Sequence, residues 1–344
     1  MNKVFKIQLE VNTPVHIGSG KDISINDYVI KDGKFYKYNI NSVIKDLSEE
    51  KKKELLDNNF AQSRRLIYDY IINNFDNINF EYTAKVSQKK GKIKGKFTKN
   101  LVEDLYKENL KNTIDNRNLN QLAIKSFIGV NGKKYIPGSS IKGAIRTAIL
   151  SEGLIKNYSE IENNKNIKND PFKFLMITDT QLFNEGIEIS SIDRVSKNNF
   201  AEILNTGFKT NFQIKIRENS FEIGNIISCI NNFNKKAVEY SINGLKTMNK
   251  SLSYKDSKKI EKNNLIIENF EKISILQKNC SKDEFIINLG FGGGKIFKTI
   301  PSTNNRLFRP GKNSKISIKS SSVPLTYNLV EKNLMGWVKC KIIN

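Results

Sequence analysis

The chain contains one histidine, His16, and it is the only side chain whose ordinary pKa suits proton transfer near neutral pH. It stands at the end of an expected strand, just before Gly18, Ser19, Gly20 and Lys21. His16 could act as a general base, but with no second histidine the acid would have to be a lysine or a tyrosine. We favour a hydrogen-bonded structural or ligand-contacting histidine over a catalytic one.

A second candidate for chemistry is the segment YIPGSSIKGAIRTAIL, residues 135–150. Pro137 and Gly138 end a strand, and Ser139 or Ser140 can cap the helix that follows. The first-turn amides of such a helix lack intrahelical partners, and the helix dipole makes this end attractive to phosphate. The same pattern also fits an ordinary capped helix at the surface.

The expected helix has one apolar face, in which isoleucines and alanines recur at spacings of three and four. Lys142 and Arg146 are four residues apart and therefore share another face, where they could contact a phosphate backbone. Gly143 costs ~1 kcal/mol relative to alanine inside a helix, which favours a close approach to the backbone at this position.

A third candidate is the glycine cluster after residue 289, made of Gly290, Gly292, Gly293 and Gly294, followed by Lys295. It is not a P-loop, because isoleucine and not serine or threonine follows the lysine. It is not a dinucleotide fingerprint either, because Lys295 occupies the position of the last glycine. A loop without side chains could still admit an RNA backbone to its amides, or it could be a flexible hairpin tip.

Metal chemistry is not expected. The cysteines are far apart in sequence and form no CxxC pair, and with a single histidine they do not suggest a zinc site. We interpret them as core residues, which are Cys229, Cys280 and Cys340. The acidic candidates lack the paired spacing of a metal site; they are Asp22, Asp27, Asp179 and Asp193. We therefore expect neither a metal nor another cofactor.

The composition favours a polyanionic partner. Lysine and arginine number 57 against 35 acidic residues, which gives a formal charge of +22 and a pI of about 9.6. Only eight of these cations are arginine, so a genome rich in A/T codons would also explain the lysine excess. No run of ~18 apolar residues occurs, and the start of the chain is not a signal peptide, so we expect a cytoplasmic protein without membrane contact.

The elements that would position these residues can also be read from the sequence. Residues 5–11 alternate apolar and polar side chains, as a strand with one buried face does. Asp32-Gly33 predicts a hairpin, and Asn41 or Ser42 should cap a helix that runs to about Asp57. Short strands are expected near residues 123–128, 176–177, 187–189, 212–216 and 285–289, and mostly helix between 223 and 276.

This mixture predicts an α+β fold, with a ferredoxin-like or RRM-like antiparallel sheet and helices on one of its faces. We expect one elaborated domain over residues 1–344. Its insertions would be residues 41–118, which are helical and include a basic hairpin or loop at 85–99, and the helical residues 223–276. The open face of the sheet would be free for RNA.

The residues around His16, the PGSSIKGAIRTA block and the late glycine-rich loop together resemble the RAMP superfamily of CRISPR proteins. Within it, the length, the helical insertion and the ending LMGWV are most similar to the subunits that cap type III-A (Csm) complexes. The resemblance implies an RRM-like RAMP core that binds CRISPR RNA (crRNA), at its 3′ part, and does not cut target RNA. Related backbone subunits use an aspartate for cleavage. The nearest aspartates in this chain are Asp22 and Asp27, and the residues around them do not match the family pattern.

The resemblance also implies which residues contact RNA: His16 through Lys21, residues 138–146, residues 290–295 and, in addition, the Asp193-Arg194 pair. The implied partners are the crRNA, the neighbouring backbone subunit and other subunits of a Csm complex, and a host trimming nuclease, in antiviral defence. Two alternatives stay open at this point. One is a metal-independent crRNA-processing endoribonuclease that uses His16, and the other is a basic RNA-binding protein outside CRISPR systems.

Overall fold

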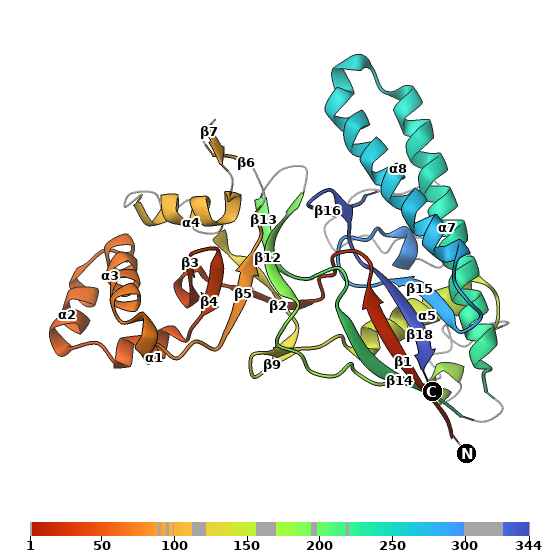
Figure 1. The fold of residues 1–344 in the computed structure, drawn as a ribbon, viewed down its shortest axis with the longest axis horizontal. Helices are drawn as coiled ribbons and strands as arrows, with labels where there is room; N and C mark the ends of the chain where they lie inside the picture. Colours follow the sequence, from red (N-terminus) through yellow and green to blue (C-terminus); the bar gives the residue numbers. More distant parts are fainter. Residues whose placement is uncertain are drawn as a thin grey trace. The chain divides into compact units, whose positions relative to one another are not determined.

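The structure is a computed structural model, and it describes residues 2–88, 91–93, 96–98, 100–111, 122–155, 170–193, 198–217, 220–298 and 326–343 (Figure 1). The chain divides into two compact units. Unit 1 comprises Met1–Val15, Tyr135–Gln181 and Thr206–Asn344, and unit 2 comprises His16–Lys134 and Leu182–Asn205. We describe each unit by itself, and the expected single domain with insertions stays a prediction.

Unit 1 is built on a five-stranded sheet with the order β11-β14-β1-β18-β15, antiparallel throughout. Its strands are β1 Asn2–Val11, β11 Leu175–Ile177, β14 Lys209–Arg217, β15 Glu284–Asn288 and β18 Trp337–Ile343, with a small hairpin of β16 Leu329–Val330 and β17 Asn333–Leu334. Its helices are α5 Gly138–Ser151, η5 Pro171–Phe174, α7 Ile223–Ser251, η6 Tyr254–Asp256, α8 Ser257–Lys278 and η7 Ile296–Lys298.

The order β1, α5, β11, β14, α7, β15 is that of the predicted ferredoxin-like arrangement. Helix α8 and strand β18 are additions to it, and β18 lies between β1 and β15 in the sheet. The alternating sequence of β1 places Ile7 and Leu9 on the buried face, where Ile7 is opposite Phe212 of β14 and Ile342 of β18. Helices α5 and α7 pack against each other, and both contact β15. In Figure 1, α5 lies behind β1 and β18, which leaves the other face of the sheet towards the viewer.

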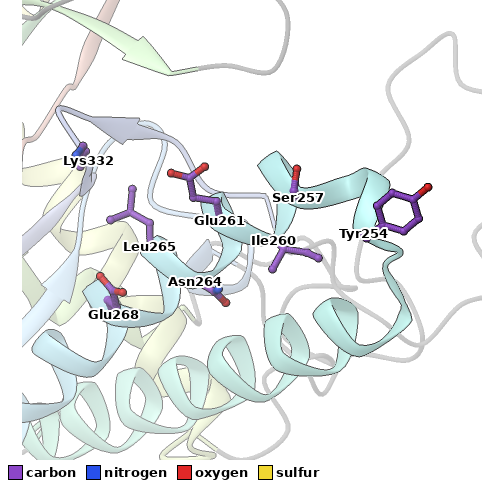
Figure 2. A pocket seen from close by; sticks show the side chains of 8 residues that line it. All are labelled: Tyr254, Ser257, Ile260, Glu261, Asn264, Leu265, Glu268 and Lys332. Carbon is purple, nitrogen blue, oxygen red and sulfur yellow. The ribbon is translucent and has the colours of Figure 1, made fainter.

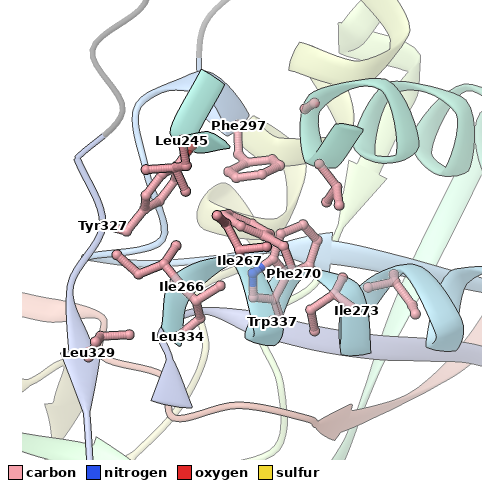
Figure 3. Close-up of a cluster of buried hydrophobic side chains, with 13 residues drawn as sticks. Leu245, Ile266, Ile267, Phe270, Ile273, Phe297, Tyr327, Leu329, Leu334 and Trp337 are labelled. Carbon is pink, nitrogen blue, oxygen red and sulfur yellow. The ribbon is translucent and has the colours of Figure 1, made fainter. Parts of the chain in front are cut away.

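The core of unit 1 is rich in aromatic rings where α8 meets the end of the sheet (Figure 3). Trp337 is fully buried, and its ring meets Phe297 at 4.8 Å and Phe270 at 6.3 Å between centroids, both edge to face. Aromatic pairs in this geometry contribute more than their buried area alone. This cluster fixes α8 to the beginning of β18.

Helices α7 and α8 occupy the region 223–276 that was predicted to be helical. Helix α7 also protects the edge of the sheet at β15. The side-chain amide of Asn231 donates to the backbone oxygen of Glu284 and accepts from the backbone amide of Ile286. The side-chain amide of Asn234 donates to the backbone oxygen of Ile286. An edge strand with unpaired backbone groups is prone to pair with other chains, and these two amides satisfy that edge.

Unit 2 has a mixed sheet whose main path runs β2-β8-β13-β12-β5-β4-β3. Its strands are β2 Gly18–Ile23, β3 Tyr28–Lys31, β4 Lys34–Lys37, β5 Tyr82–Val86, β6 Gly91–Ile93, β7 Lys96–Thr98, β8 Ile124–Phe127, β9 Gly129–Val130, β10 Lys133–Lys134, β12 Ile187–Asp193 and β13 Asn198–Leu204. Its helices are η1 Ile25–Asp27, α1 Ile40–Lys45, α2 Glu49–Asp57, α3 Phe60–Asn73, η2 Phe75–Asn77 and α4 Leu101–Lys111.

The predicted hairpin at Asp32-Gly33 is confirmed, because both residues have positive φ, 51° and 71°, as a tight type I′ turn requires. The predicted helix from residue 41 to 57 was wrong in its extent. Asn39 caps α1, which ends at Lys45, and Ser48 then caps the separate helix α2. Within the basic stretch 85–99, β6 and β7 form a short hairpin.

Candidate nucleic-acid interface

His16 lies in unit 2, and its ring is buried, with 2% of its surface exposed. Its Nδ1 lies 2.8 Å from the backbone oxygen of Glu202, and its ring meets Phe127 edge to face. Burial lowers the pKa of His16, and the hydrogen bond to Glu202 opposes this effect only in part. The imidazole is therefore neutral at pH 7 and enclosed by protein, which supports the structural interpretation.

The carboxylate of Glu202 organises the interior beside His16. It is fully buried and accepts hydrogen bonds from Lys134 Nζ at 2.7 Å, from the amide of Phe127 at 2.6 Å and from the hydroxyl of Tyr82. Ser126 Oγ adds a longer contact at 3.3 Å, and Lys134 Nζ also lies 4.5 Å from the centre of the Tyr82 ring. A buried charge is tolerated only when it is paired and hydrogen-bonded, so this network fixes β5, β8, β10 and β13 to one another.

The residues after His16 are presented at the surface by a distortion of β2. This strand pairs with β8 at both ends, but the register shifts between Gly18 and Asp22. Ser19, Gly20 and Lys21 lie within the shift and are exposed, and Gly20 has a φ of 82° that favours glycine. Residues 18–21 of the predicted contact segment therefore form an exposed bulge beside the buried network around Glu202, whereas His16 and Ile17 are buried.

The N-terminus of α5 differs from the prediction. The helix begins at Gly138, Pro137 supplies no capping side chain, and the carboxylate of Asp179 accepts the hydrogen bond of the Gly138 amide at 2.7 Å. The prediction that Ser139 or Ser140 caps the helix was wrong, because both lie inside its first turn. Asp179 already supplies the negative charge that this helix end favours, so the end is a weaker phosphate site than the sequence suggests.

The two cations of α5 make contacts within unit 1. Lys142 Nζ donates to the oxygen of Phe172 at 2.8 Å, and the Arg146 guanidinium lies 5.5 Å from the centre of the Phe172 ring. Both side chains thus help to hold η5 against α5. Gly143 is exposed, and a Cβ built on it would meet no atom within 4 Å among the described residues. Internal packing does not explain this glycine, so a ligand close to it stays a prediction.

The glycine-rich loop after β15 packs closely on its own unit. Gly292 and Gly294 have φ values of 91° and 110°. A Cβ at Gly293 would collide with the side-chain amide of Asn288, and one at Gly294 would collide with the ring of Tyr327. These glycines are therefore required by the fold itself, whether or not the loop also contacts RNA.

Two of the three predicted RNA-contacting blocks lie in unit 1, where α5 packs against η7 directly after the glycine-rich loop. Lys295 in this loop is exposed, and the oxygen of Gly290 accepts a hydrogen bond from Lys298. The block 16–21 belongs to unit 2, and Arg194 lies outside the described residues. RNA contact by all of these residues stays a prediction.

The sheet face in unit 1 that carries Lys6 is covered by α8 at Ile286 and Trp337, and its remaining part carries a set of lysines that sequence reasoning did not name. We call it the lysine face, and it consists of Lys6, Lys209, Lys215, Lys339 and Lys341, interspersed with the amides of Gln8, Asn211 and Gln213. All of these side chains are exposed or half-buried. They occupy the polar positions of the alternating strands, and that alternation is the signal by which they could have been found.

Some of these charges are paired and others are not. Glu10 lies 3.5 Å from Lys209, and Glu284 lies 2.9 Å from Lys339 and 3.8 Å from Lys341. Among the described residues, no carboxylate lies within 4 Å of Lys6 or Lys215. Lys6 is opposite Gln213, and Val4 is opposite Lys215. Lys6 and Lys215 are therefore diagonal neighbours on the adjacent strands β1 and β14. They leave positive charge available on the sheet.

A separate pocket of about 610 Å³ lies along α8 (Figure 2). Its lining residues are Tyr254, Ser257, Ile260, Glu261, Asn264, Leu265, Glu268 and Lys332. Two carboxylates against one ammonium group make this pocket unfavourable for a polyanion. We therefore do not include it in the nucleic-acid interface.

Other kinds of site find little support in the part of the chain that the structure describes. No group of three or more histidine, cysteine or acidic side chains there could hold a metal ion. No described helix has the length and apolar character needed to cross a membrane. The expectation of no cofactor stays a prediction.

Comparisons with known proteins identify the family to which this chain belongs. The family model of the RAMP superfamily matches residues 8–298, and the chain is a member of that superfamily. Among curated proteins it is similar to the CRISPR system protein Csm5 of Methanocaldococcus jannaschii, with 29% identity over 346 residues, covering 86% of this chain and 72% of the relative.

Two solved structures show the same fold. One is a chain of a cryo-EM structure of a Csm–crRNA–target RNA ternary complex from a type III-A CRISPR-Cas system, with a TM-score of 0.60 and 15% identity. The other is the crystal structure of T. onnurineus Csm5, with a TM-score of 0.56 and 17% identity. Each alignment covers 98% of this chain and 100% of the other. The α+β RAMP fold predicted from the sequence is thereby confirmed.

Proposed function

We propose that this chain is an RNA-binding subunit of a type III-A CRISPR (Csm) effector complex. It would cap the backbone filament at the 3′ end of the crRNA and support crRNA maturation and assembly in antiviral defence. Membership of the RAMP superfamily supports this proposal, as do the similarity to a curated Csm5 and the fold shared with a chain of a Csm–crRNA–target RNA complex. Its partners would be the crRNA, the adjacent backbone subunit and a host trimming nuclease.

The observation that carries the proposal is the lysine face. A single-stranded RNA backbone is a regular row of negative charges, and lysines on adjacent strands can pair with successive phosphates. None of the side chains that define this face is aromatic, so base stacking of the RRM kind is not available there. The face is suited to hold RNA by its backbone, without reading its sequence, as a subunit that accepts many different crRNA spacers must do.

We infer a non-catalytic role. His16 is buried and neutral, and its Nδ1 is engaged with Glu202, so an endoribonuclease that uses it as a base is not favoured. Incubation of the purified chain with repeat RNA in EDTA tests this directly. We expect no cleavage, whereas cleavage that disappears in His16→Ala would overturn the assignment.

Reconstitution tests the role as a subunit. Sister subunits and crRNA are assembled with the wild-type chain, without it, and with a variant that carries Lys6→Ala and Lys215→Ala. We expect crRNA 3′ ends to become nuclease-sensitive when the chain is absent, and to be partly so with the variant. Identical assembly and identical protection with and without the chain would refute the proposed function.

A further inference from the structure

Unit 2 contains a pocket of about 330 Å³ beside the exposed bulge of β2. Its walls come from β2, η1, β4, β5, β8 and the β9–β10 turn, all within the same unit. The volume lies at the lower end of the ~300–1,000 Å³ that small-ligand pockets occupy. A phosphate backbone held on the lysine face of unit 1 does not account for this pocket.

Two cations of the pocket are available to an anion. Lys21 comes from β2 and Lys133 from β10, and both side chains are exposed. Among the described residues, no carboxylate lies within 4 Å of either ammonium group. The other two lining lysines are already paired, Lys37 with Glu81 at 2.5 Å and Lys134 with Glu202 at 2.7 Å. Lys21 and Lys133 could therefore pair with a phosphate group without breaking an existing ion pair.

The pocket also holds a carboxylate without an ion pair. Asp27 in η1 is half-buried, and no cation lies within 4 Å of it among the described residues. Burial raises the pKa of Asp27 while Lys37 opposes this effect, and Ser24 contributes a backbone hydrogen bond. A carboxylate placed in this way accepts hydrogen bonds from hydroxyl groups, as acidic residues in dinucleotide sites do from a ribose 2′-hydroxyl.

One wall of the pocket is held in place by the hydrogen bonds of Glu202. Tyr82 and Phe127 line it, and both donate to the buried carboxylate of Glu202. Lys134, which also lines the pocket, is held by the same carboxylate at 2.7 Å. Such a wall loses little conformational entropy when a ligand binds, because its side chains are already fixed.

From this arrangement we propose that the pocket binds one ribonucleotide of the RNA, with its phosphate between Lys21 and Lys133 and its ribose hydroxyl donating to Asp27. The proposal rests on the proposed function and adds to it a site that distinguishes RNA from DNA. The ammonium groups of the lysine face would pair with phosphates, which RNA and DNA share. The 2′-hydroxyl is the group by which a protein makes this distinction at a given position.

The test uses the full chain and free nucleotides, which avoids the variable register of a long RNA. Equilibrium dialysis measures the binding of the ribonucleoside 5′-monophosphates and of their 2′-deoxy counterparts. The wild-type chain should prefer the ribonucleotide by about tenfold, as expected for one hydrogen bond to a charged acceptor. Asp27→Ala should abolish this preference. The double variant Lys21→Ala, Lys133→Ala should lower the affinity for both kinds of nucleotide by tenfold or more.

Matched controls are Asp69→Ala on α3 and Lys34→Ala on β4, both exposed residues outside the pocket, and these should bind as the wild type does. Equal binding of ribo- and deoxyribonucleotides by the wild type would overturn the proposal. The proposal would also be overturned if Asp27→Ala and the double lysine variant bound the ribonucleotides as tightly as the two controls do. If Asp27→Ala fails to fold, the double lysine variant decides.

The outcome is separable from that of the proposed function. A chain that protects crRNA in the assembled complex but shows no preference for ribonucleotides would refute only this site. A chain that prefers ribonucleotides but contributes nothing to the complex would refute only the role as a subunit.

Discussion

Removal of the Glu202 carboxylate should strongly destabilise unit 2. In Glu202→Leu, the ammonium group of Lys134, with only 7% of its side chain exposed, would be left as a buried charge without a counter-ion. The amide of Phe127 and the hydroxyl of Tyr82 would lose their acceptor as well. Breaking a buried ion pair by removing one partner costs about 3–5 kcal/mol, and the orphaned donors place this case in the upper half of that range.

Urea unfolding measures the effect. With a urea m-value of ~2 kcal/mol/M, a loss of about 4 kcal/mol shifts the midpoint of unit 2 by about 2 M. Because the single tryptophan, Trp337, lies in unit 1, its fluorescence reports the other unit, and hydrogen exchange of the Phe127 amide reports unit 2. We expect this amide to exchange at least a hundredfold faster in Glu202→Leu.

A second variant, with Lys134→Met added to Glu202→Leu, distinguishes the energetic cost of the unpaired Lys134 charge from that of the lost hydrogen bonds to Phe127 and Tyr82. Because the buried cation is then gone, the double variant should be more stable than Glu202→Leu alone. Lys133→Met, a neighbouring change at an exposed lysine, should alter stability by less than about 0.5 kcal/mol. Lys134→Met alone completes the comparison. The reasoning is refuted if Glu202→Leu costs less than about 1 kcal/mol, or if the effects of Glu202→Leu and Lys134→Met on the free energy of unfolding simply add in the double variant.

Three further predictions concern the elements near the interface. Asp179→Ala should lower the free energy of unfolding by about 1 kcal/mol, because α5 loses its cap, and Asp179→Asn should lower it by less. Urea midpoints measure both effects, and equal stability of the wild type and the two variants would contradict the assigned cap. Gly143→Ala should raise stability by up to ~1 kcal/mol in thermal unfolding, because the helix gains propensity and the added methyl group meets open space, so a lower melting temperature would contradict this structure. The pKa of His16 is lowered in the folded protein, so the contribution of this residue to stability is present above about pH 6.5 and is lost as the pH falls below that value through the folded pKa. The wild type should therefore lose more stability than His16→Gln between pH 7 and pH 5. Parallel stability profiles of the two proteins against pH would refute the assignment.

Local patterns predicted the strands well, because period-two alternation and turn chemistry depend on neighbours in sequence. The hairpin at Asp32-Gly33 and the alternating strand β1 are examples. The break between α1 and α2 was also visible in principle, since Ser48 followed by two glutamates is a capping signal that the single expected helix ignored.

Interactions between distant residues were not predictable from patterns. The cap of α5 is Asp179, 41 residues beyond Gly138, and only the fold brings the two together. An acid inside the apolar run of β13 is an anomaly that marks Glu202 as unusual, but nothing in the sequence indicates that Lys134 is its partner. The glycines of the late loop were noted for their possible RNA contact, whereas the structure shows Gly293 packed on Asn288.

The most direct test of the account is the salt dependence of RNA affinity. The wild-type chain and a variant with Lys6→Ala and Lys215→Ala are titrated with single-stranded RNA across a range of salt concentrations. Each phosphate contact contributes ~0.7 to the slope of log K against log salt, so the variant should lose roughly 1.4 of slope. A control with Lys258→Ala and Lys259→Ala on α8 should keep the wild-type slope. Equal slopes for all three proteins would contradict RNA binding on the lysine face.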